Sequence, residues 1–244
     1  MKNKFDNYLD AKFKLNGETP RFFLRTKIFL SLMNSKKGKV LDIGCGDGNL
    51  LKELHKRNFE CIGIDISKKA IDFASFNLKN LGIPLYCKSI DDFNFSYKFD
   101  IVILGEILEH IEQDIDFLIK TSNFLKENGT LLISVPYDKK LWNKTDEMVG
   151  HYRRYSKSEI FTKLHNSGYR VKRYIVWGFP LNRFLNSFLS ESTLKLRKNK
   201  RLFLPRYILK FVKYLFLIDN LFNFTERGVG IIIMANKRRK NEKI

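Results

Sequence analysis

Three alternate glycines between two carboxylates are the first residues in the chain whose spacing predicts chemistry. Gly44, Gly46 and Gly48 follow Asp42, and Asp65 lies 19 residues beyond Gly46. Glycines let a ligand approach the backbone closely, and the free N–H groups of a helix start would face the same point. A carboxylate at the position of Asp65 can accept hydrogen bonds from both hydroxyls of a ribose. The spacing predicts a nucleoside site; the alternative is a tight glycine turn that binds nothing.

The elements around these residues must be a strand, a helix and a second strand. Residues 40–43 predict the end of a buried strand, and Leu50, Leu51 and Leu54 predict the helix that follows. Residues 61–65 predict the next parallel strand, which places its last carboxylate beside the glycine loop. Further strands are predicted at 85–88, 99–104, 130–136, 171–177 and 228–236, and helices at 21–33, 68–80, 114–126 and 157–167. This alternation predicts an α/β fold with a doubly wound sheet.

The glycine spacing separates two kinds of nucleoside site. A dinucleotide fingerprint has its third glycine three residues after the second, where this chain has Asn49, and Gly48 comes one residue early. The segment from Asp42 to Gly48 therefore resembles motif I of class I S-adenosylmethionine-dependent methyltransferases, and the resemblance extends over residues 38–136. It implies a Rossmann-like seven-stranded sheet with strand seven antiparallel, and a helical insertion between strands six and seven.

The same resemblance implies S-adenosyl-L-methionine as the cofactor and assigns residues to it. The implied donor contacts are Asp42, Gly44, Cys45, Gly46, Gly48, Asp65, Ile66, Ser89, Ile90, Leu104 and Gly105. Ser89 stands where the family often has an acidic residue that holds the adenine, and Asp91 is the alternative. The expected organisation is a single domain over 1–244. It begins with an N-terminal helical cover (1–37) and the donor-binding core (38–136). The acceptor loop, helix and strand six (137–180), an amphipathic helical insertion (181–224), and strand seven with a basic tail (225–244) follow.

Acceptor chemistry is predicted just beyond the fourth strand. The run from Glu106 to His110 resembles the Glu-x-x-Glu-His segment of ubiquinone-type O-methyltransferases and of a small-RNA 2′-O-methyltransferase family. If the run is helical, Glu106, Glu109 and His110 share one face and would hold a divalent metal. The alternative is that Glu109 and His110 orient the loop and line the acceptor pocket without a metal. Glu106 and Glu109 are the residues of this run that are assigned to acceptor binding. His110 is the first candidate for proton handling, because an ordinary imidazole titrates near neutral pH.

A second histidine follows the fifth strand. His151 lies in a loop that resembles the Gly-His-x-Arg-x-Tyr segment of bacterial methyltransferases in cell-surface sugar and lipid pathways. Tyr152, Arg153 and Arg154 are predicted to bind the acceptor, because two arginines can hold a phosphate or carboxylate. The alternative is a solvated basic loop with Tyr155 packed inward.

Positive charge is concentrated at the carboxyl-terminal end of the chain. The net charge is +19, and residues 181–244 hold 15 Lys and Arg against 4 Asp and Glu. Within 203–218 a basic stripe of Arg206, Lys210 and Lys213 runs along an otherwise apolar helix, which fits an anionic membrane surface. A lid or a dimer surface is the competing interpretation. The amino-terminal residues contain no apolar signal segment and the three cysteines have no paired spacing, so a cytoplasmic protein is expected. The membrane interpretation of the basic stripe would place the protein at the inner face of the membrane.

The expected activity is methyl transfer to oxygen on a small or lipid-linked acceptor such as a glycan, a quinone or a cell-envelope compound. An RNA 2′-O-methyltransferase is the enzymatic alternative, although the chain has no appended RNA-binding module and nucleic acid is not the expected partner. A non-catalytic S-adenosylmethionine-binding protein is the other alternative. The sequence does not predict the oligomeric state.

Overall fold

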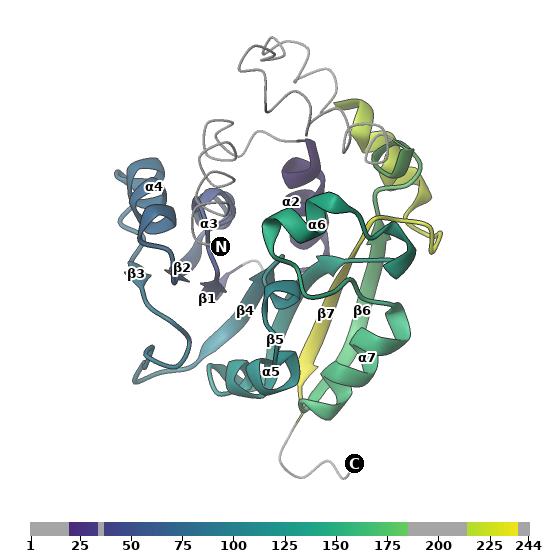
Figure 1. Ribbon diagram of the computed structural model, residues 1–244. Coiled ribbons are helices and arrows are strands. Elements are labelled where there is room, and N and C mark those ends of the chain that lie inside the picture. The colour runs from purple at the N-terminus through teal and green to yellow at the C-terminus, as the bar shows by residue number, and fades with distance from the viewer. Residues whose placement is uncertain (1–19, 34–36, 185–213, 239–244) are drawn as a thin grey trace.

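A seven-stranded sheet forms the centre of the protein. The structure is a computed structural model that describes residues 20–33, 37–184 and 214–238. The strand order is β3-β2-β1-β4-β5-β7-β6, and β7 runs antiparallel to β5 and β6 (Figure 1). The strands are β1 (Gly38–Ile43), β2 (Phe59–Asp65), β3 (Leu85–Cys87), β4 (Phe99–Gly105), β5 (Leu125–Pro136), β6 (Tyr169–Trp177) and β7 (Gly230–Lys237). The predicted fold class is confirmed.

Helices cover both faces of the sheet. The α-helices are α2 (Pro20–Leu32), α3 (Asn49–His55), α4 (Lys68–Leu78), α5 (Asp114–Ser122), α6 (Lys144–Val149) and α7 (Lys157–Asn166). Three 3-10 helices are also described, η1 (Leu108–His110), η2 (Lys139–Leu141) and η3 (Phe216–Phe222). The helices α5 and α7 pack on one face, and α2, α3 and α4 pack on the other (Figure 1).

Alternation along the strands explains the two layers. On β5, Leu131 and Ile133 join the core under α5 and α7, whereas Leu132 joins the core on the opposite face. All three side chains are fully buried, as expected for a strand that is covered on both sides. The sequence of the strand is therefore a continuous apolar run, although its side chains point alternately into a separate core on each face of the sheet.

The glycine loop lies at the point where the strand order reverses. The chain leaves β1 between two parallel neighbours, β2 on one side and β4 on the other. Ligands of doubly wound sheets bind at this switch point, beyond the carboxyl ends of the strands. The fold thus brings the ends of β1, β2 and β4 together.

Several predicted elements differ from the observed ones. The helix predicted to reach residue 126 ends at Ser122, and β5 begins at Leu125 rather than 130, because Phe99 pairs with Leu125 across β4 and β5. The short helix α6 was not predicted. The run 106–110 does not form an α-helical turn, since only Leu108–His110 is helical and it is a 3-10 helix.

The insertion is described only at its two ends. Residues 185–213, which carry the predicted basic stripe, lie outside the described residues. The segment η3 is anchored by Asp219, which is fully buried and accepts hydrogen bonds from the backbone N–H groups of Leu181 (2.7 Å) and Asn182 (3.0 Å). No helix in the described parts of the chain is both long and apolar enough to span a bilayer.

Candidate active site

Asp65 ties the glycine loop to the end of β2. Its Oδ2 accepts a hydrogen bond from the Gly46 N–H at 3.0 Å, and its Oδ1 accepts one from the Ser67 N–H at 2.8 Å. The loop is fixed further because the N–H groups of Gly44 and Cys45 donate to the Ile64 carbonyl. The carboxylate predicted to hold a ribose therefore lies directly against the predicted nucleoside loop.

The three glycines of the loop have different surroundings. All three have positive φ, at 72° for Gly44, 57° for Gly46 and 74° for Gly48, which a residue with a side chain seldom adopts. A Cβ atom at Gly44 would meet Ile107 and one at Gly48 would meet Leu78, both at 2.7 Å, whereas a Cβ at Gly46 would meet nothing within 4 Å. Two of the glycines therefore allow internal packing, and Gly46 exposes backbone to an open space beside Asp65.

The remaining predicted donor contacts lie around the same strand ends. Ile66 follows Asp65 with 79% of its side chain exposed, which is a large apolar surface beside the loop. Gly105 ends β4, and a Cβ there would meet nothing within 4 Å, while Leu104 is fully buried in the core. Ser89 donates to Asp92 at 2.7 Å.

Two further predicted contacts differ in their environment. Ile90 packs partly buried against the core. Asp91, the alternative to Ser89, forms an ion pair with Lys120 at 2.6 Å. The contacts of Ile90 and Asp91 with the donor therefore stay predictions. The same holds for each of the other residues assigned to the donor.

Arg25 is a positively charged residue near these strand ends that the sequence patterns do not predict. Arg25 extends from α2, and its Nη1 lies 3.7 Å from Oε2 of Glu106. Glu106 has φ 61° and also accepts a hydrogen bond from Ser134 on β5. Burial acts to raise the pKa of Glu106, but the charges of Arg25, Arg21 and His151 and the hydrogen bond from Ser134 together outweigh it, so that the pKa is lowered. The carboxylate is therefore held ionised beside the donor loop.

Asp42 is the buried acid of the site. It is 3% exposed, and burial raises its pKa to about 8, although the positive charge of Arg25 opposes the rise. The negative charges of Asp65 and Asp47 add to the rise. Asp42 is therefore largely protonated at neutral pH.

This shift predicts how stability depends on pH. The folded chain keeps the Asp42 proton up to about pH 8, whereas an unfolded chain loses it near its ordinary value of about 3.9. The wild type therefore loses stability as pH rises through this window, by up to about 1.4 kcal/mol per pH unit. Asp42→Asn is expected to gain stability relative to wild type as the pH rises from about 5 to about 8. Thermal unfolding of both proteins measures this, and a constant difference would contradict it.

The second group of side chains converges beyond β4. The ligand atoms of Glu109, His110 and His151 all lie within 4.8 Å of one another. Glu109 is fully buried, its Oε1 lies 3.8 Å from His151 Nε2, and the two imidazole rings stand edge to face with centroids 4.7 Å apart. The acceptor loop is docked here by its backbone, since the Tyr152 N–H donates to the Glu109 carbonyl at 2.8 Å.

The metal set expected from the sequence is not brought together. Glu106 was predicted to share a helix face with Glu109 and His110, but its carboxylate contacts Ser134 and Arg25 instead. The prediction assumed an α-helical turn, and the positive φ of Glu106 breaks it. Glu106, Glu109 and His110 therefore do not form one metal site, whereas Glu109 and His110 lie together with His151 in a cluster that offers three possible ligand atoms.

His151 is held by a carboxylate that was also missed. Its Nδ1 lies 2.8 Å from Oδ1 of Asp146, which is 2% exposed and belongs to the unpredicted helix α6. Asn143 begins this helix with a capping box that includes Asp146, and the pattern Asn-x-x-Asp is the signal that could have revealed it. Burial opposes ionisation of Asp146, but hydrogen bonds from His151 and Arg154 lower its pKa.

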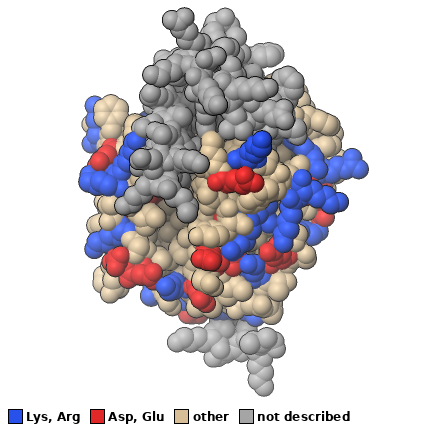
Figure 2. Space-filling view, viewed as in Figure 1, with Lys and Arg blue, Asp and Glu red and all other residues tan. Residues whose placement is uncertain are grey.

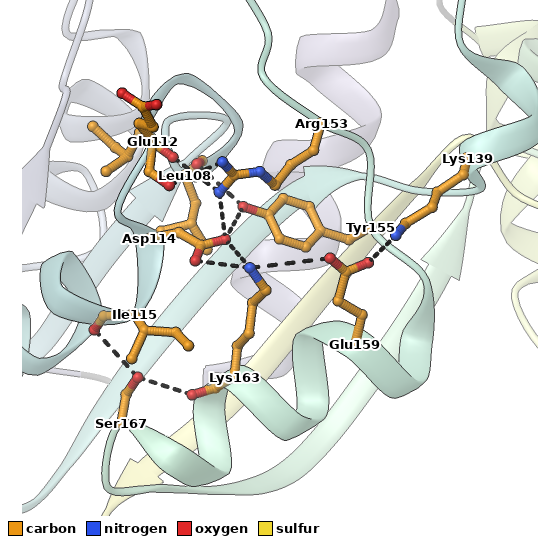
Figure 3. A network of polar contacts seen from close by, with 11 residues as sticks. Leu108, Glu112, Asp114, Ile115, Lys139, Arg153, Tyr155, Glu159, Lys163 and Ser167 are labelled. Atoms are coloured by element: carbon orange, nitrogen blue, oxygen red, sulfur yellow. Dashed lines mark hydrogen bonds and ion pairs between the residues drawn. The ribbon is translucent and has the colours of Figure 1, made fainter.

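The two arginines of the acceptor loop make internal contacts. Arg154 is 5% exposed and donates to Asp146 at 2.9 Å. Arg153 lies 2.7 Å from Asp114 and donates to the carbonyls of Ile111 and Glu112, as Figure 3 shows. The geometry gives no support to their predicted role in holding an anionic acceptor group.

Tyr155 completes the network that these contacts begin. It is fully buried, its hydroxyl donates to Asp114 at 2.9 Å, and the Leu108 carbonyl oxygen lies 3.2 Å from the same hydroxyl. Lys163 from α7 pairs with the same Asp114 at 2.6 Å (Figure 3). The inward packing of Tyr155, left open as an alternative, is what the structure shows, whereas Tyr152 is 55% exposed. The loop therefore braces the turn that carries Glu109 and His110.

The fold and the loop define a class of protein. The strand order with an antiparallel seventh strand, and the glycine loop with Asp65 at the switch point, are those of the class I S-adenosylmethionine-dependent methyltransferases. Residues 34–173 match a family described as a methyltransferase domain. The chain belongs to this family, and S-adenosyl-L-methionine is its cofactor, as predicted.

Curated relatives share the core of the chain. Ubiquinone biosynthesis O-methyltransferase of Pelagibacter ubique is 41% identical over 102 residues, which are 41% of this chain and 42% of the relative. The protein of the same name from Rickettsia canadensis is 27% identical over 165 residues, 62% of this chain and 70% of the relative. The match therefore spans less than half the length of the Pelagibacter protein.

Solved structures resemble the whole fold. A putative methyltransferase from Haloferax volcanii, solved in complex with the Trm112 methyltransferase activator, aligns with a TM-score of 0.70, 14% identity and 99% coverage of both chains. The N-methyltransferase NodS from Bradyrhizobium japonicum, in complex with S-adenosyl-L-homocysteine, aligns with a TM-score of 0.64 and 16% identity over 97% of this chain and 100% of that one. At these identities the likeness concerns the fold alone.

Proposed function

We propose that this protein transfers the methyl group of S-adenosylmethionine to a phenolic hydroxyl of a lipid-linked, quinone-type acceptor. The observation that carries the proposal is the convergence of Glu109, His110 and His151 beyond β4, within the methyltransferase core. A hydroxyl acceptor needs a base to expose its lone pair, and imidazole is suited to that role. The curated relatives named as ubiquinone biosynthesis O-methyltransferases support an oxygen atom on a quinone-type ring.

Donor binding follows from the first group of residues. Asp65 would accept hydrogen bonds from the ribose, and Gly46 leaves room for the nucleoside against its backbone. Arg25 supplies a positive charge near the end of β4 that would pair with the carboxylate of the donor. The sulfonium methyl group would then face the histidine pair.

In the proposed reaction, His151 rather than His110 takes the proton. The acceptor oxygen forms a bond to the methyl carbon, the carbon–sulfur bond breaks with its electron pair on sulfur, and the hydroxyl proton moves to Nε2 of His151. The products are the methyl ether and S-adenosylhomocysteine. His151 is preferred because Asp146 holds its other ring nitrogen at 2.8 Å. The protein mainly aligns the two reactants, which converts a bimolecular step into an effectively unimolecular one.

The test is a transfer assay with a labelled donor. The purified protein is incubated with S-adenosylmethionine labelled in the methyl group and with a catechol that carries a farnesyl chain. The expected result is a labelled methyl ether and an equal amount of S-adenosylhomocysteine. Binding of the donor without transfer to this catechol or to catechols with longer prenyl chains would overturn the proposal.

We further propose that the protein works at the cytoplasmic face of an anionic membrane, where a prenylated acceptor resides. Leu221, which belongs to the anchored η3 segment, and Phe224, which follows it, are 71% and 83% exposed. Lys and Arg side chains gather on the right of the view in Figure 2, over the side that contains α7, β6 and η3 in Figure 1. Exposed apolar side chains beside positive charge fit the headgroup boundary of an anionic bilayer.

This location predicts a measurable affinity for vesicles. The protein is expected to sediment with phosphatidylglycerol vesicles more than with phosphatidylcholine vesicles, and high salt should release it. The double variant Leu221→Ser with Phe224→Ser should sediment several-fold less. Phe76→Ser on α4 is the matched control, because Phe76 is 70% exposed and lies outside the proposed surface. Equal loss in the double variant and the control would contradict the proposal.

A further inference from the structure

We propose that Asp146 is a positioning residue that fixes the tautomer of His151, so that the Nε2 lone pair faces the acceptor. The inference rests on the proposed function, in which His151 receives the proton. Asp146 Oδ1 lies 2.8 Å from Nδ1 of His151. A carboxylate accepts and does not donate, so the Nδ1 atom must carry a hydrogen, and in the neutral imidazole Nε2 is then left bare.

The carboxylate of Asp146 is itself fixed by two donors on its other oxygen. Oδ2 accepts from Arg154 Nε at 2.9 Å and from the backbone N–H of Asn143 at 2.9 Å. Asp146 and Arg154 are 2% and 5% exposed, so water does not compete strongly for these bonds. Only Oδ1 is therefore directed at the imidazole.

The backbone brings His151 back to this carboxylate. Gly150 ends α6 with φ 80°, which reverses the chain, and the His151 N–H then donates to the Asp146 carbonyl at 2.9 Å. The imidazole is thereby held between Asp146 and Glu109, whose Oε1 lies 3.8 Å from Nε2. The His110 ring stands edge to face against it. The ring therefore cannot rotate without breaking the Asp146 bond.

Asp146→Asn tests the inference with almost no change of shape. The oxygen of the introduced amide would face the two donors, Arg154 and the Asn143 N–H, because an NH₂ group cannot accept from them. The NH₂ group would then point at Nδ1 of His151 and force the hydrogen onto Nε2. The expected result is a fall in kcat of about 100-fold, the size of a lost general base, with unchanged affinity for S-adenosylhomocysteine by calorimetry.

Nitrogen-15 NMR of the histidine rings reports which ring nitrogen carries the hydrogen. A loss of stability alone would not change that position. In the wild type, at about pH 8.5, where an ordinary imidazole is neutral, the His151 Nε2 signal is expected to be that of an unprotonated nitrogen. In Asp146→Asn the unprotonated signal should move to Nδ1. The chain has 4 histidines, so single substitutions can assign the signals.

Asn143→Ala is the matched control. It removes the side-chain cap of α6, a hydrogen bond from the Thr145 N–H at 2.8 Å, and leaves the carboxylate of Asp146 and its partners in place. It should lower thermal stability but keep the wild-type tautomer and a kcat of the same order. An unchanged tautomer in Asp146→Asn, or equal losses of kcat in both variants, would overturn the inference. A wild type that transfers no methyl group to catechols would instead refute the proposed function, and the NMR result would still decide the tautomer.

Discussion

Asp65→Ala is expected to weaken binding of S-adenosylmethionine on the order of 1000-fold, the effect of two lost hydrogen bonds to a charged group at about 2 kcal/mol each. The carboxylate already accepts from the N–H groups of Gly46 and Ser67, at 3.0 Å and 2.8 Å. Each oxygen has more than one acceptor direction, so the same group can also receive the two ribose hydroxyls. Removing it takes away both the sugar contact and the bond that holds the loop. Calorimetry with S-adenosylhomocysteine measures the loss.

Asp72→Ala is the control for this experiment. Asp72 is an acid on α4 that pairs with Lys68 at the surface, and its side chain is 59% exposed. The substitution removes one negative charge from the helix that follows β2 and should leave donor affinity unchanged. If Asp65→Ala binds the donor as tightly as wild type while remaining folded, the assignment of the ribose to Asp65 is wrong.

The donor side of the site was predictable because it is local in sequence. The glycines at 44, 46 and 48 and the carboxylate at 65 lie within one strand–helix–strand unit. Such a unit has one handedness and places consecutive parallel strands side by side. The apolar residues that predict strand β1 are buried on both faces of the sheet. Val40 lies in one core and Leu41 in the other. Spacing and periodicity therefore determined this part of the structure.

The acceptor side was predicted less well because its contacts join distant segments. Arg153 meets Asp114 across 39 positions, and Tyr155 meets the same residue across 41. A loop with two arginines has the same composition whether it binds an acceptor or its own carboxylates. The carboxylate of Asp114, which decides between these interpretations for Arg153, is identified only by the fold, whereas that of Asp146 has a local signal in its capping pattern.

Glu106 shows a second limit. Its position before Glu109 and His110 fits an α-helical face, but the chain passes through φ 61° at this residue. Ser134 on the neighbouring strand and Arg25 on α2 draw the carboxylate to the donor side. The local pattern could not reveal this, because both partners come from other elements.

The two histidines can be separated by their substitutions. His151→Gln is expected to lower kcat about 1000-fold, within the range for loss of a general base together with its alignment. His110→Gln should lower kcat by about 10-fold or less. The reason is that Asp146 orients His151 through Nδ1, whereas His110 meets that ring edge to face. Donor affinity should be unchanged in both variants, since neither imidazole belongs to the glycine loop or to Asp65.

The comparison needs a histidine that lies elsewhere in the fold. His165 is exposed on α7, where it contacts Asn166, so His165→Gln controls for the loss of an imidazole as such. Rates at saturating donor and farnesyl catechol, measured for all three variants, separate the roles. If His110→Gln abolishes transfer and His151→Gln leaves it intact, the proton acceptor is His110. The Asp146–His151 pair would then serve only to dock the loop on Glu109, because that contact needs no lone pair on Nε2.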